Sequence, residues 1–406
     1  MISPQPSGHL YIHVPFCRSR CHYCSFPSVA VETVPEKAYL AALEVEFQYR
    51  LKSWPQAFLP LSTLYFGGGT PSLFSPSFYA RIIDVLAQRF GFCPDHEVTL
   101  EANPADISRE KIAGYRAAGI NRISLGVQTF APEGLQLLGR RHDGFMVEKA
   151  IDLIRRGGIE NLSLDLIYAW PGQSLNALDR DLRKLALLVP EHVSAYSLSL
   201  EPGTRLAQAV VAGDLQAVSG DDQAKMMQLV ETGLKDAGLY RYEISNFARN
   251  RHLQAQHNLA YWQLHDYLGL GAGACGGWRC RKDPQHWAER YSNMSDPFAY
   301  IQRLGPVNTS QFVGGETFEF RPELWFEQEI IDLKTSFIES LMMGLRLRQG
   351  VGLAGLRVEY GTQTVDAMIS RALKLRVDGL LDWDESNLWI TDKGMFLSDE
   401  ILNYLL

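Results

Sequence analysis

The stretch YIHVPFCRSRCHYCSF, residues 11–26, decides how the rest of the chain can be interpreted. Its start is mostly apolar, as in a buried strand, and three cysteines follow closely: Cys17, Cys21 and Cys24. Thiolates are the usual ligands of iron–sulfur clusters, and a four-iron cube held by only three of them keeps one iron open to a small molecule. The Cys-x3-Cys-x2-Cys spacing therefore predicts a [4Fe–4S] cluster with a second ligand. A zinc site completed by His22 and three unligated cysteines are the alternatives.

The composition is that of an ordinary globular protein. The chain has 406 residues, a hydrophobic fraction of 46% and a charged fraction of 21%, so two or three structural units are expected. No stretch approaches the ~20 apolar residues of a membrane span, and the start, MISPQPSG, lacks the features of a signal peptide. Half of the six cysteines are clustered, which favours a reducing cytoplasm over a disulfide framework. A net charge of −7 gives no general attraction to nucleic acid.

Short β-rich segments alternate with longer amphipathic segments through the first half of the chain, which is the pattern of a parallel sheet built from βα units. Strands are expected at 9–14, 63–66, 97–102, 122–127, 161–167 and 193–200. The helices expected between them lie at 36–51, 77–89, 108–118, 143–156 and 175–188. The pattern indicates an α/β fold, a partial (β/α)6 barrel over residues 1–205, with its ligand at the carboxyl ends of the strands.

The alternation ends near residue 205, and two smaller units are expected beyond it. A helix at 221–237, a strand at 240–244 and Gly-rich and Trp-rich segments indicate an α+β extension or cap over 206–325. From 326 to 406, a long helix at about 329–346, a helix at 364–375 and a strand pair at 380–383 and 388–390 indicate a small, winged-helix-like helical module. Cys275 and Cys280 fall in a Gly-rich segment that is expected to be a flexible loop, and Cys93 is expected near a helix end.

Polar residues recur where the expected strands end. The run Gly67-Gly68-Gly69-Thr70-Pro71 follows the second strand, and its glycines would let backbone N–H groups approach a ligand closely. Glu101 ends the third strand and Gln128 the fourth, while Asp165 lies within the apolar fifth, where a carboxylate is costly unless it is paired or binds a ligand. Arg140 could pair with Asp165 or with the acid group of a ligand, and a solvated surface arginine is the alternative. Together these groups would suit an amino-acid nucleoside beside the open iron.

The cysteine triplet, with Tyr23 before the third cysteine, resembles the motif of the radical S-adenosylmethionine (SAM) superfamily. The segments FGGGTPS, EANP, SLGVQTF, LGR at 138–140 and DLIYAWPGQ resemble its coproporphyrinogen-dehydrogenase-like branch, over roughly residues 9–280. The resemblance implies that the three cysteines bind a [4Fe–4S] cluster whose open iron is chelated by SAM, and that an electron passed through the cluster can split the sulfonium. It also implies that eight further residues contact SAM: Tyr11, Gly68, Gly69, Thr70, Glu101, Gln128, Arg140 and Asp165.

Two features distinguish sub-branches of this family. Coproporphyrinogen dehydrogenases carry a longer N-terminal arm and a further cysteine at the place of Phe26, whereas HNLAYW at 257–262 resembles the HNxxYW signature of a heme-chaperone family. That resemblance implies a protein that binds heme, with His257 as a contact, and transfers it to apo-hemoproteins, including respiratory enzymes. A histidine nitrogen is a common heme-iron ligand, and Tyr261 and Trp262 can pack flat against a porphyrin, but the same residues also suit a hydrogen-bonded core. An oxygen-independent coproporphyrinogen III dehydrogenase and a radical enzyme with another substrate are the alternatives.

The resemblance also implies partners. These are heme, apo-hemoprotein acceptors and an electron donor to the cluster, in a cytoplasmic protein with no transmembrane segment and no nucleic-acid partner. A homodimer and peripheral membrane contact are left open, as are the acceptor and the cleavage of SAM in the functional cycle. The heme-iron ligand is also open, because Cys275 is an alternative to His257.

Overall fold

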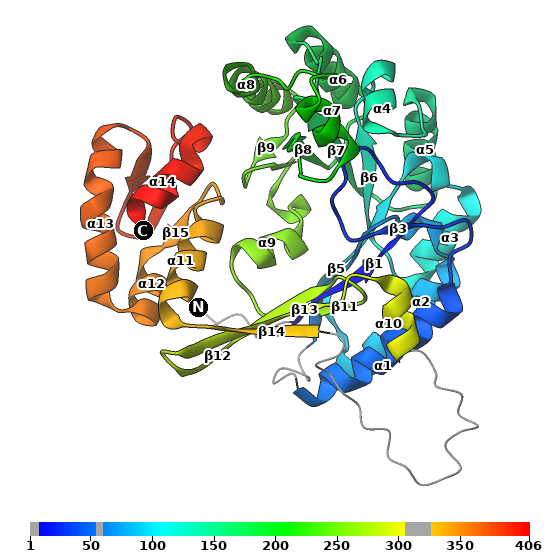
Figure 1. The fold of residues 1–406 in the computed structure, drawn as a ribbon, viewed down its shortest axis with the longest axis horizontal. Helices are drawn as coiled ribbons and strands as arrows, with labels where there is room; N and C mark the ends of the chain where they lie inside the picture. Colours follow the sequence, from blue (N-terminus) through cyan, green and yellow to red (C-terminus); the bar gives the residue numbers. More distant parts are fainter. Residues whose placement is uncertain (1–7, 54–59, 305–325) are drawn as a thin grey trace.

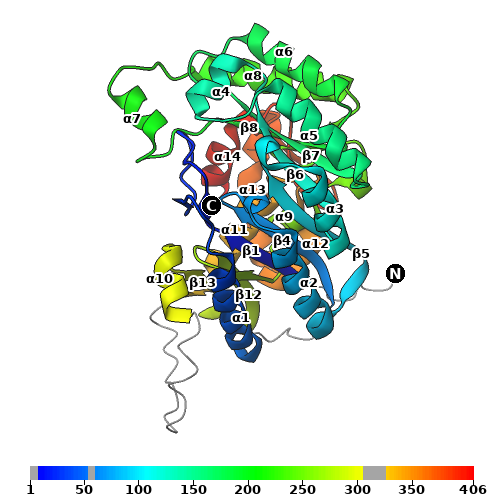
Figure 2. The same ribbon diagram turned by 90° about the vertical axis from the view of Figure 1, so that its right-hand side faces the viewer.

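Six parallel strands form the centre of the computed structural model, which describes residues 8–53, 60–304 and 326–406. In sheet order they are β1 (Gly8–Val14), β4 (Leu61–Gly68), β5 (Phe92–Ala102), β6 (Arg122–Gln128), β7 (Asn161–Tyr168) and β8 (His192–Ser197). The helices between them are α1 (Glu36–Ser53), α2 (Pro76–Phe90), α3 (Arg109–Ala118), α4 (Pro132–Leu138), α5 (Gly144–Arg156) and α6 (Leu175–Leu187). Helices α2, α3 and α5 lie along one face of the sheet (Figure 2). The expected α/β fold with a partial (β/α)6 barrel is confirmed.

Local sequence signals explain where these elements begin. Ser108, Asp143 and Ser174 each accept the backbone N–H three residues further on, which caps α3, α5 and α6. Helix α4 was not expected, because its seven residues are too few to show a helical period. Strand β5 begins at Phe92 and not at 97, because Phe92 pairs with Leu61 of β4. Cys93 lies on this strand, shortly after the end of α2 at Phe90, so its expected position near a helix end is confirmed.

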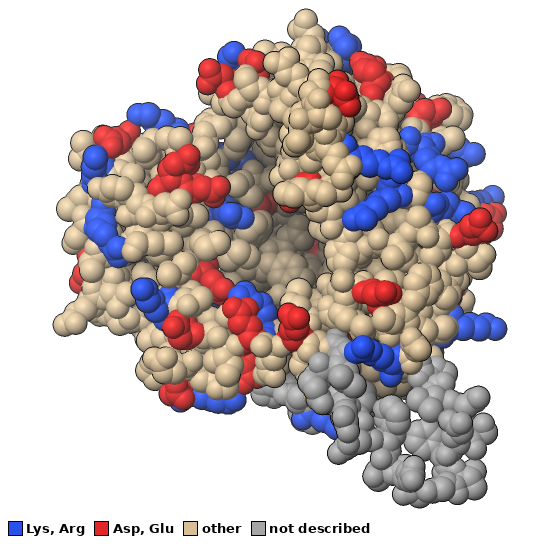
Figure 3. Space-filling view, in the orientation of Figure 1, with Lys and Arg blue, Asp and Glu red and all other residues tan. Residues whose placement is uncertain are grey.

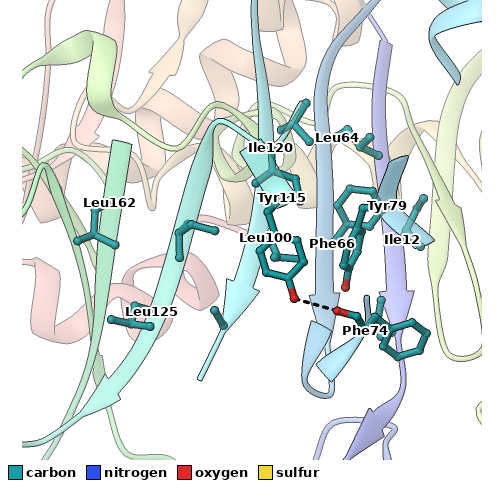
Figure 4. Packing of buried hydrophobic residues seen from close by; sticks show 14 of the residues in the cluster. Ile12, Leu64, Phe66, Phe74, Tyr79, Leu100, Tyr115, Ile120, Leu125 and Leu162 are labelled. Atoms are coloured by element: carbon teal, nitrogen blue, oxygen red, sulfur yellow. Dashed lines mark hydrogen bonds between the residues drawn. The ribbon is translucent and has the colours of Figure 1, made fainter. Parts of the chain in front are cut away.

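The main core lies between the central strands and their helices (Figure 4). Phe66 of β4, Leu100 of β5 and Leu125 of β6 are fully buried there. Tyr115 of α3 is also fully buried, and its hydroxyl donates to the carbonyl of Phe74 at 2.9 Å, so its one polar atom is satisfied. This packing fixes the strand ends that carry the candidate site.

The strands of the extension enlarge the same sheet at both edges. Beside β1, strand β11 (Tyr267–Leu270) is parallel, and β12 (Cys275–Asp283), β13 (His286–Asn293) and β14 (Phe326–Ile331) follow as antiparallel strands. Beside β8 come β10 (Asn246–Ala248) and β9 (Tyr240–Arg241). The twelve-stranded sheet is open, with β14 and β9 at its two edges. The helices of this part are α7 (Arg205–Val211), α8 (Gly220–Asp236), α9 (Gln256–Trp262) and α10 (Pro297–Leu304).

Three expectations for the second half of the chain were wrong. The strand expected at 240–244 spans only two residues. The long helix expected at 329–346 is α11 (Leu333–Gly344), which starts later because β14 pairs with β13 and Asp332 caps the helix. Cys275 and Cys280 lie on β12 and not in a flexible loop. The glycines of this segment serve close chain packing, since a Cβ at Gly269 would lie 1.8 Å from the carbonyl oxygen of Cys275.

The C-terminal module has a core of its own. Helices α11, α12 (Leu353–Tyr360), α13 (Thr362–Val377) and α14 (Ser398–Leu405) surround an antiparallel sheet of β15 (Val351–Gly352), β17 (Asn387–Ile390) and β16 (Leu381–Trp383). Leu341, Val365 and Leu388 are fully buried in it. Helices around a small sheet agree with the winged-helix-like expectation. The module stands beside the barrel and is joined to it through β12, β13 and β14 (Figure 1).

Candidate functional site

The cysteine loop lies at the rim of a cavity of about 590 Å³ at the carboxyl ends of the parallel strands. Cys17, Cys21 and Cys24 all line this cavity. Strand β2 (Phe16–Cys17) pairs with β3 (Val29–Ala30) at the base of the loop. His22 fastens the loop to α4, because its N–H donates to the carbonyl of Leu138 at 3.1 Å and its Nδ1 lies 2.9 Å from that of Leu137. His22 is not among the described residues that line the cavity, and its Nδ1 is engaged with Leu137, which argues against His22 as a fourth zinc ligand beside the three thiols.

The surroundings of the three thiols suit a bound metal cluster. Burial raises the pKa of the Cys17 and Cys24 thiols, so both favour the neutral form when nothing is bound. The Thr70 hydroxyl donates to Cys17 Sγ at 3.4 Å, and the Arg140 guanidinium lies 3.5 Å from Cys21 Sγ. A hydrogen-bond donor and a cation beside the sulfurs stabilise the thiolate form that iron requires.

The glycine-rich end of β4 packs closely against residues 13–16 of the segment that precedes the cysteine loop. Gly68 has φ +113°, and a Cβ there would lie 2.4 Å from the ring of His13. A Cβ on Gly69 would lie 2.8 Å from the backbone of Val14 and Phe16. The N–H groups of Gly68, Gly69 and Thr70 donate to Glu101, Val14 and Phe16, respectively. In this structure these N–H groups are engaged within the chain, and the glycines allow close packing of β4 on the cysteine-bearing segment; contact of the glycine-rich strand end with a ligand stays a prediction.

Two carboxylates face the cavity from β5 and β7. Glu101 accepts the Tyr65 hydroxyl at 2.8 Å and the Gly68 N–H at 3.1 Å, and burial raises its pKa to about 7. Asp165 accepts the Ser124 hydroxyl at 2.8 Å, and burial raises its pKa as well. Neither carboxylate has a cation bonded to it among the described residues, so both are suited to receive the positive charge of a ligand.

Arg140 does not pair with Asp165 as one alternative expected. Its Nη2 donates to the carbonyl of Gly126 at 3.0 Å and to the side-chain oxygen of Asn103. Its Nε is buried and has no hydrogen-bond partner within the described part of the chain. A buried donor of this kind is costly to leave unpaired, and Arg140 also lines the cavity, which fits the other alternative, an acidic group on a ligand.

Seven of the eight residues expected to contact SAM line the cavity: Gly68, Gly69, Thr70, Glu101, Gln128, Arg140 and Asp165. Gln128 has φ 69°, a left-handed backbone that is uncommon outside glycine and frequent at functional sites. Tyr11 does not line the cavity. Its hydroxyl bonds to His13 Nδ1 at 2.9 Å, and its ring stacks on Tyr65 with centroids 6.0 Å apart, so it lies behind Tyr65.

The same cavity is also lined by residues that sequence reasoning did not assign to it: Arg122, His192, Ser194, Tyr196, Ala255 and Asn258. His192 is fully buried, and its ring nitrogens bond to the hydroxyls of Ser163 at 2.8 Å and Tyr242 at 2.9 Å. These residues lie on β6, β8 and the segment around α9. That they converge on one cavity can be recognised only when the order of the strands in the sheet is known. Asn258 belongs to the HNxxYW motif, so this motif reaches the same cavity as the cysteines.

His257 of the same motif is packed into the molecule. It is 1% exposed, and its Nδ1 lies 2.7 Å from Thr63 Oγ1 while its Nε2 lies 2.9 Å from the Tyr261 hydroxyl. Its ring stacks on Tyr65 with centroids 5.1 Å apart. Both ring nitrogens are thus engaged, so His257 can ligate a metal only after one of these bonds is broken. The Trp262 Nε1 is buried with no described hydrogen-bond partner.

A second cleft, of about 400 Å³, lies on the other side of α9. Arginines dominate its charge: Arg241, Arg251 and Arg348 line it, with Gln256, Leu259 and Gln263 of α9 as one wall. Arg241 is 9% exposed, and within the described chain its Nη1 has no hydrogen-bond partner. Asp392 offsets part of the charge, at 3.2 Å from Arg241 and 3.1 Å from Arg348. Figure 3 shows that this face of the molecule is hollowed between the barrel and the C-terminal module.

Comparisons with known proteins agree with this arrangement. The model of the radical SAM superfamily matches residues 11–185, and that of the HemN C-terminal domain matches residues 331–397. The chain is 33% identical to heme chaperone HemW of Bacillus subtilis, over 98% of both chains. It is 35% identical to heme chaperone HemW of Mycobacterium tuberculosis, over 99% of this chain and 95% of the relative.

One solved structure shares the whole fold. Coproporphyrinogen III oxidase (HemN) of Escherichia coli superimposes with a TM-score of 0.77, over 99% of this chain and 91% of that chain, at 22% identity. This likeness supports the barrel and its C-terminal module, but at that identity it shows the fold alone. No described helix combines the length and apolar composition that a membrane crossing needs.

Proposed function

This chain belongs to the radical SAM superfamily and within it to the HemW family of heme chaperones, and from that membership we infer that it binds heme and transfers it to apo-hemoproteins. The observation that carries the proposal is identity of 33% along the full length of a HemW relative, since it includes the cysteine loop, the extension and the C-terminal module. Phe26 lines the cavity rim and is 62% exposed, at the position where coproporphyrinogen dehydrogenases carry a further cysteine. This difference supports the chaperone over a decarboxylating dehydrogenase.

Radical SAM membership implies a [4Fe–4S] cluster and SAM, and the residues that line the first cavity fit both groups. We propose that Cys17, Cys21 and Cys24 hold the cluster and that the seven cavity-lining residues named above contact SAM, with Tyr11 supporting Tyr65 from behind. When bound, the cluster supplies the electron that splits the sulfonium. Of the chain's own groups, Glu101 offers a carboxylate to the amino group of the ligand, and Arg140 Nε offers a buried donor to its acid group.

Heme is the cargo, and we place one edge of it in the second cleft. A porphyrin is larger than this cleft, but its two propionates would meet the side chains of Arg251 and Arg348 and the unpaired Nη1 of Arg241. His257 remains a candidate iron ligand only if it gives up Thr63 or Tyr261. Cys275 is the other candidate: it is exposed on β12, and its Sγ lies 3.2 Å from Ser292 Oγ.

The remaining parts of the proposal concern the protein's partners and its localisation in the cell. An electron donor is needed to reduce the cluster, and the acceptors proposed are apo-hemoproteins that include respiratory enzymes. We place the protein in the cytoplasm, with peripheral membrane contact during delivery and a homodimer as further parts of the hypothesis.

The test is an anaerobic titration of the cluster-reconstituted protein with heme, followed by absorbance. Wild type is compared with His257→Ala and Cys275→Ala. Saturable, stoichiometric binding is expected, and the variant that shifts the Soret band identifies the iron ligand. No specific binding, together with conversion of coproporphyrinogen by the reduced protein, would overturn the chaperone proposal and assign the chain to the dehydrogenases.

A further inference from the structure

The β12–β13 hairpin carries a group of metal-ligating side chains that the radical SAM site does not use. Cys280 of β12 and His286 and Glu289 of β13 bring one ligand atom each to within 4.8 Å of one another. All three side chains are partly buried. Within the described residues this is the one such group of histidine, cysteine and carboxylate side chains, and it lies outside both cavities.

The hairpin backbone holds these three residues in place. The β12–β13 register shifts between Arg279 and Asp283, so Cys280 lies at an irregularity of the ladder. Asp283 accepts the N–H of His286 at 3.0 Å, which fixes the start of β13. The Cys280 thiol lies 3.4 Å from the carbonyl of His286. These hydrogen bonds at the turn thus hold the Cys280 thiol and the His286 imidazole in place on the two strands.

The donor set points to a particular metal class. A thiolate, an imidazole and a carboxylate suit zinc, whereas calcium and magnesium prefer oxygen ligands alone. Glu289 Oε1 is already close to its neighbours, at 2.7 Å from His286 Nε2 and 2.8 Å from Lys282 Nζ. A zinc ion would replace the proton shared by His286 and Glu289, and Lys282, whose side chain is 57% exposed, is able to turn into solvent.

We propose that Cys280, His286 and Glu289 bind a zinc ion, with a water molecule as the fourth ligand. Binding releases the proton of the Cys280 thiol to solvent, and the proton on His286 Nε2 leaves that atom while the neutral imidazole carries one at Nδ1, with no change in oxidation state. The site is structural, because the same hairpin holds the C-terminal module: Arg279 pairs with Glu359 at 3.1 Å, and Arg290 with Glu339 at 3.1 Å. Zinc at the hairpin end would brace the strands to which the module is attached.

The test must separate this site from the cluster cysteines, which also bind zinc. We would use the full-length chain with Cys17, Cys21 and Cys24 all replaced by Ala, and titrate it with cobalt(II) as a spectroscopic probe. The expected result is saturation at one cobalt per chain with a thiolate-to-cobalt charge-transfer band, and displacement of cobalt by zinc. Cys280→Ser in this background should abolish the band, and His286→Gln should weaken binding, whereas Cys275→Ser on the same strand should leave both unchanged.

A second measurement covers the case in which the triple-alanine chain does not fold. The zinc content of the cluster-reconstituted wild type is compared with that of Cys280→Ser, since iron then occupies the thiols of Cys17, Cys21 and Cys24. Loss of one zinc per chain in Cys280→Ser supports the site. A folded background variant with no thiolate–cobalt band, or equal zinc contents in the two reconstituted proteins, would overturn the proposal. Neither result depends on heme binding.

Discussion

His257 of α9 and Thr63 of β4 are joined by a hydrogen bond of 2.7 Å between the imidazole Nδ1 and the threonine Oγ1. The same Oγ1 lies 2.9 Å from Nδ1 of His9 on β1, and the His9 Nε2 lies 3.1 Å from His265 Nδ1. Three imidazoles and one hydroxyl therefore tie α9 and the segment after it to the first two parallel strands. Burial lowers the pKa of His257 well below its ordinary range, so this connection is made by neutral rings.

The first prediction concerns the stability that His257 provides. His257→Ala leaves the Tyr261 hydroxyl without its partner and Thr63 with His9 alone, so the free energy of unfolding should fall by about 1–3 kcal/mol. Urea unfolding of the cluster-free protein measures this change. His252→Ala, at an exposed position close by in the sequence, is the matched control and should have little effect. Equal stability of wild type and His257→Ala would mean that the hydrogen bonds of His257 contribute nothing.

The second prediction concerns cluster ligation. Replacement of Cys17, Cys21 or Cys24 by Ala should abolish the reconstituted cluster, because a set of three ligands has no spare member. Iron and sulfide analysis with absorbance spectra measures the loss. Cys93→Ala is the control, since Cys93 lies on β5 outside the cavity and should keep full iron and sulfide. A cluster that survives any of the three substitutions with an unchanged spectrum would refute the assignment.

The third prediction follows from the pKa of Glu101. With a pKa of about 7 in the folded protein and an ordinary value of 4.5, Glu101 contributes stability that is fully present below about 4.5 and is lost as the pH rises through 7. A cationic ligand needs the ionised form, so the affinity for SAM should rise by about tenfold from pH 6 to pH 8. Anaerobic calorimetry measures this dependence. Glu101→Gln should bind SAM weakly without that step; a wild-type affinity that is flat across the range argues against contact with Glu101.

The fourth prediction concerns the glycine-rich strand end. A methyl group on Gly69 would meet the backbone of both Val14 and Phe16 at 2.8 Å, and backbone cannot move aside as a flexible side chain does. Gly69→Ala should lower the free energy of unfolding by about 1–3 kcal/mol and weaken cluster retention, because Phe16 precedes Cys17. Gly355→Ala in α12 is the control, since its methyl group meets nothing and should stabilise the helix by about 0.5–1 kcal/mol.

The fifth prediction concerns the placement of the heme propionates. Arg251→Ala removes one cation from the second cleft, so the affinity for heme should fall, while the affinity for heme dimethyl ester, which lacks the two carboxylates, should change little. Absorbance titrations with both porphyrins measure the difference. Arg109→Ala, far along the chain on α3, is the arginine control. An equal loss of affinity for both porphyrins would indicate that the propionates do not bind in this cleft.

The parallel half of the fold could be predicted because its local signals agree with one another. Strands such as β6 are buried on both faces, and Ser or Asp residues mark the helix starts that follow or precede them. The same alternation placed the cysteine loop and Glu101 at strand ends, where the structure has them. Predictions failed where the outcome depends on distant partners: residues 329–331 of β14 were expected to open the long helix, and only their pairing with β13 makes them part of a strand.

The finer geometry of the site was also beyond sequence reasoning. Arg140 can reach several acceptors, and its choice of Gly126 and Asn103 over Asp165 depends on how α4 ends and not on any local pattern. The split role of α9 is similar: His257 faces Thr63, Asn258 faces the first cavity and Leu259 faces the second cleft. Three consecutive residues with three different environments cannot be assigned before the packing of the helix is known.

The pairing of β1 with β11 has a consequence for how the protein is made. The strand that precedes the cysteine loop leaves the ribosome well before β11, so one of its two edges receives its partner only when residues 267–270 have been synthesised. Until then the growing chain exposes an unpaired, apolar strand edge, which is a template for pairing with other chains. Molecular chaperones of protein folding are therefore expected to occupy the nascent barrel, and iron–sulfur assembly to begin after translation has passed β11 and not as soon as the third cysteine emerges.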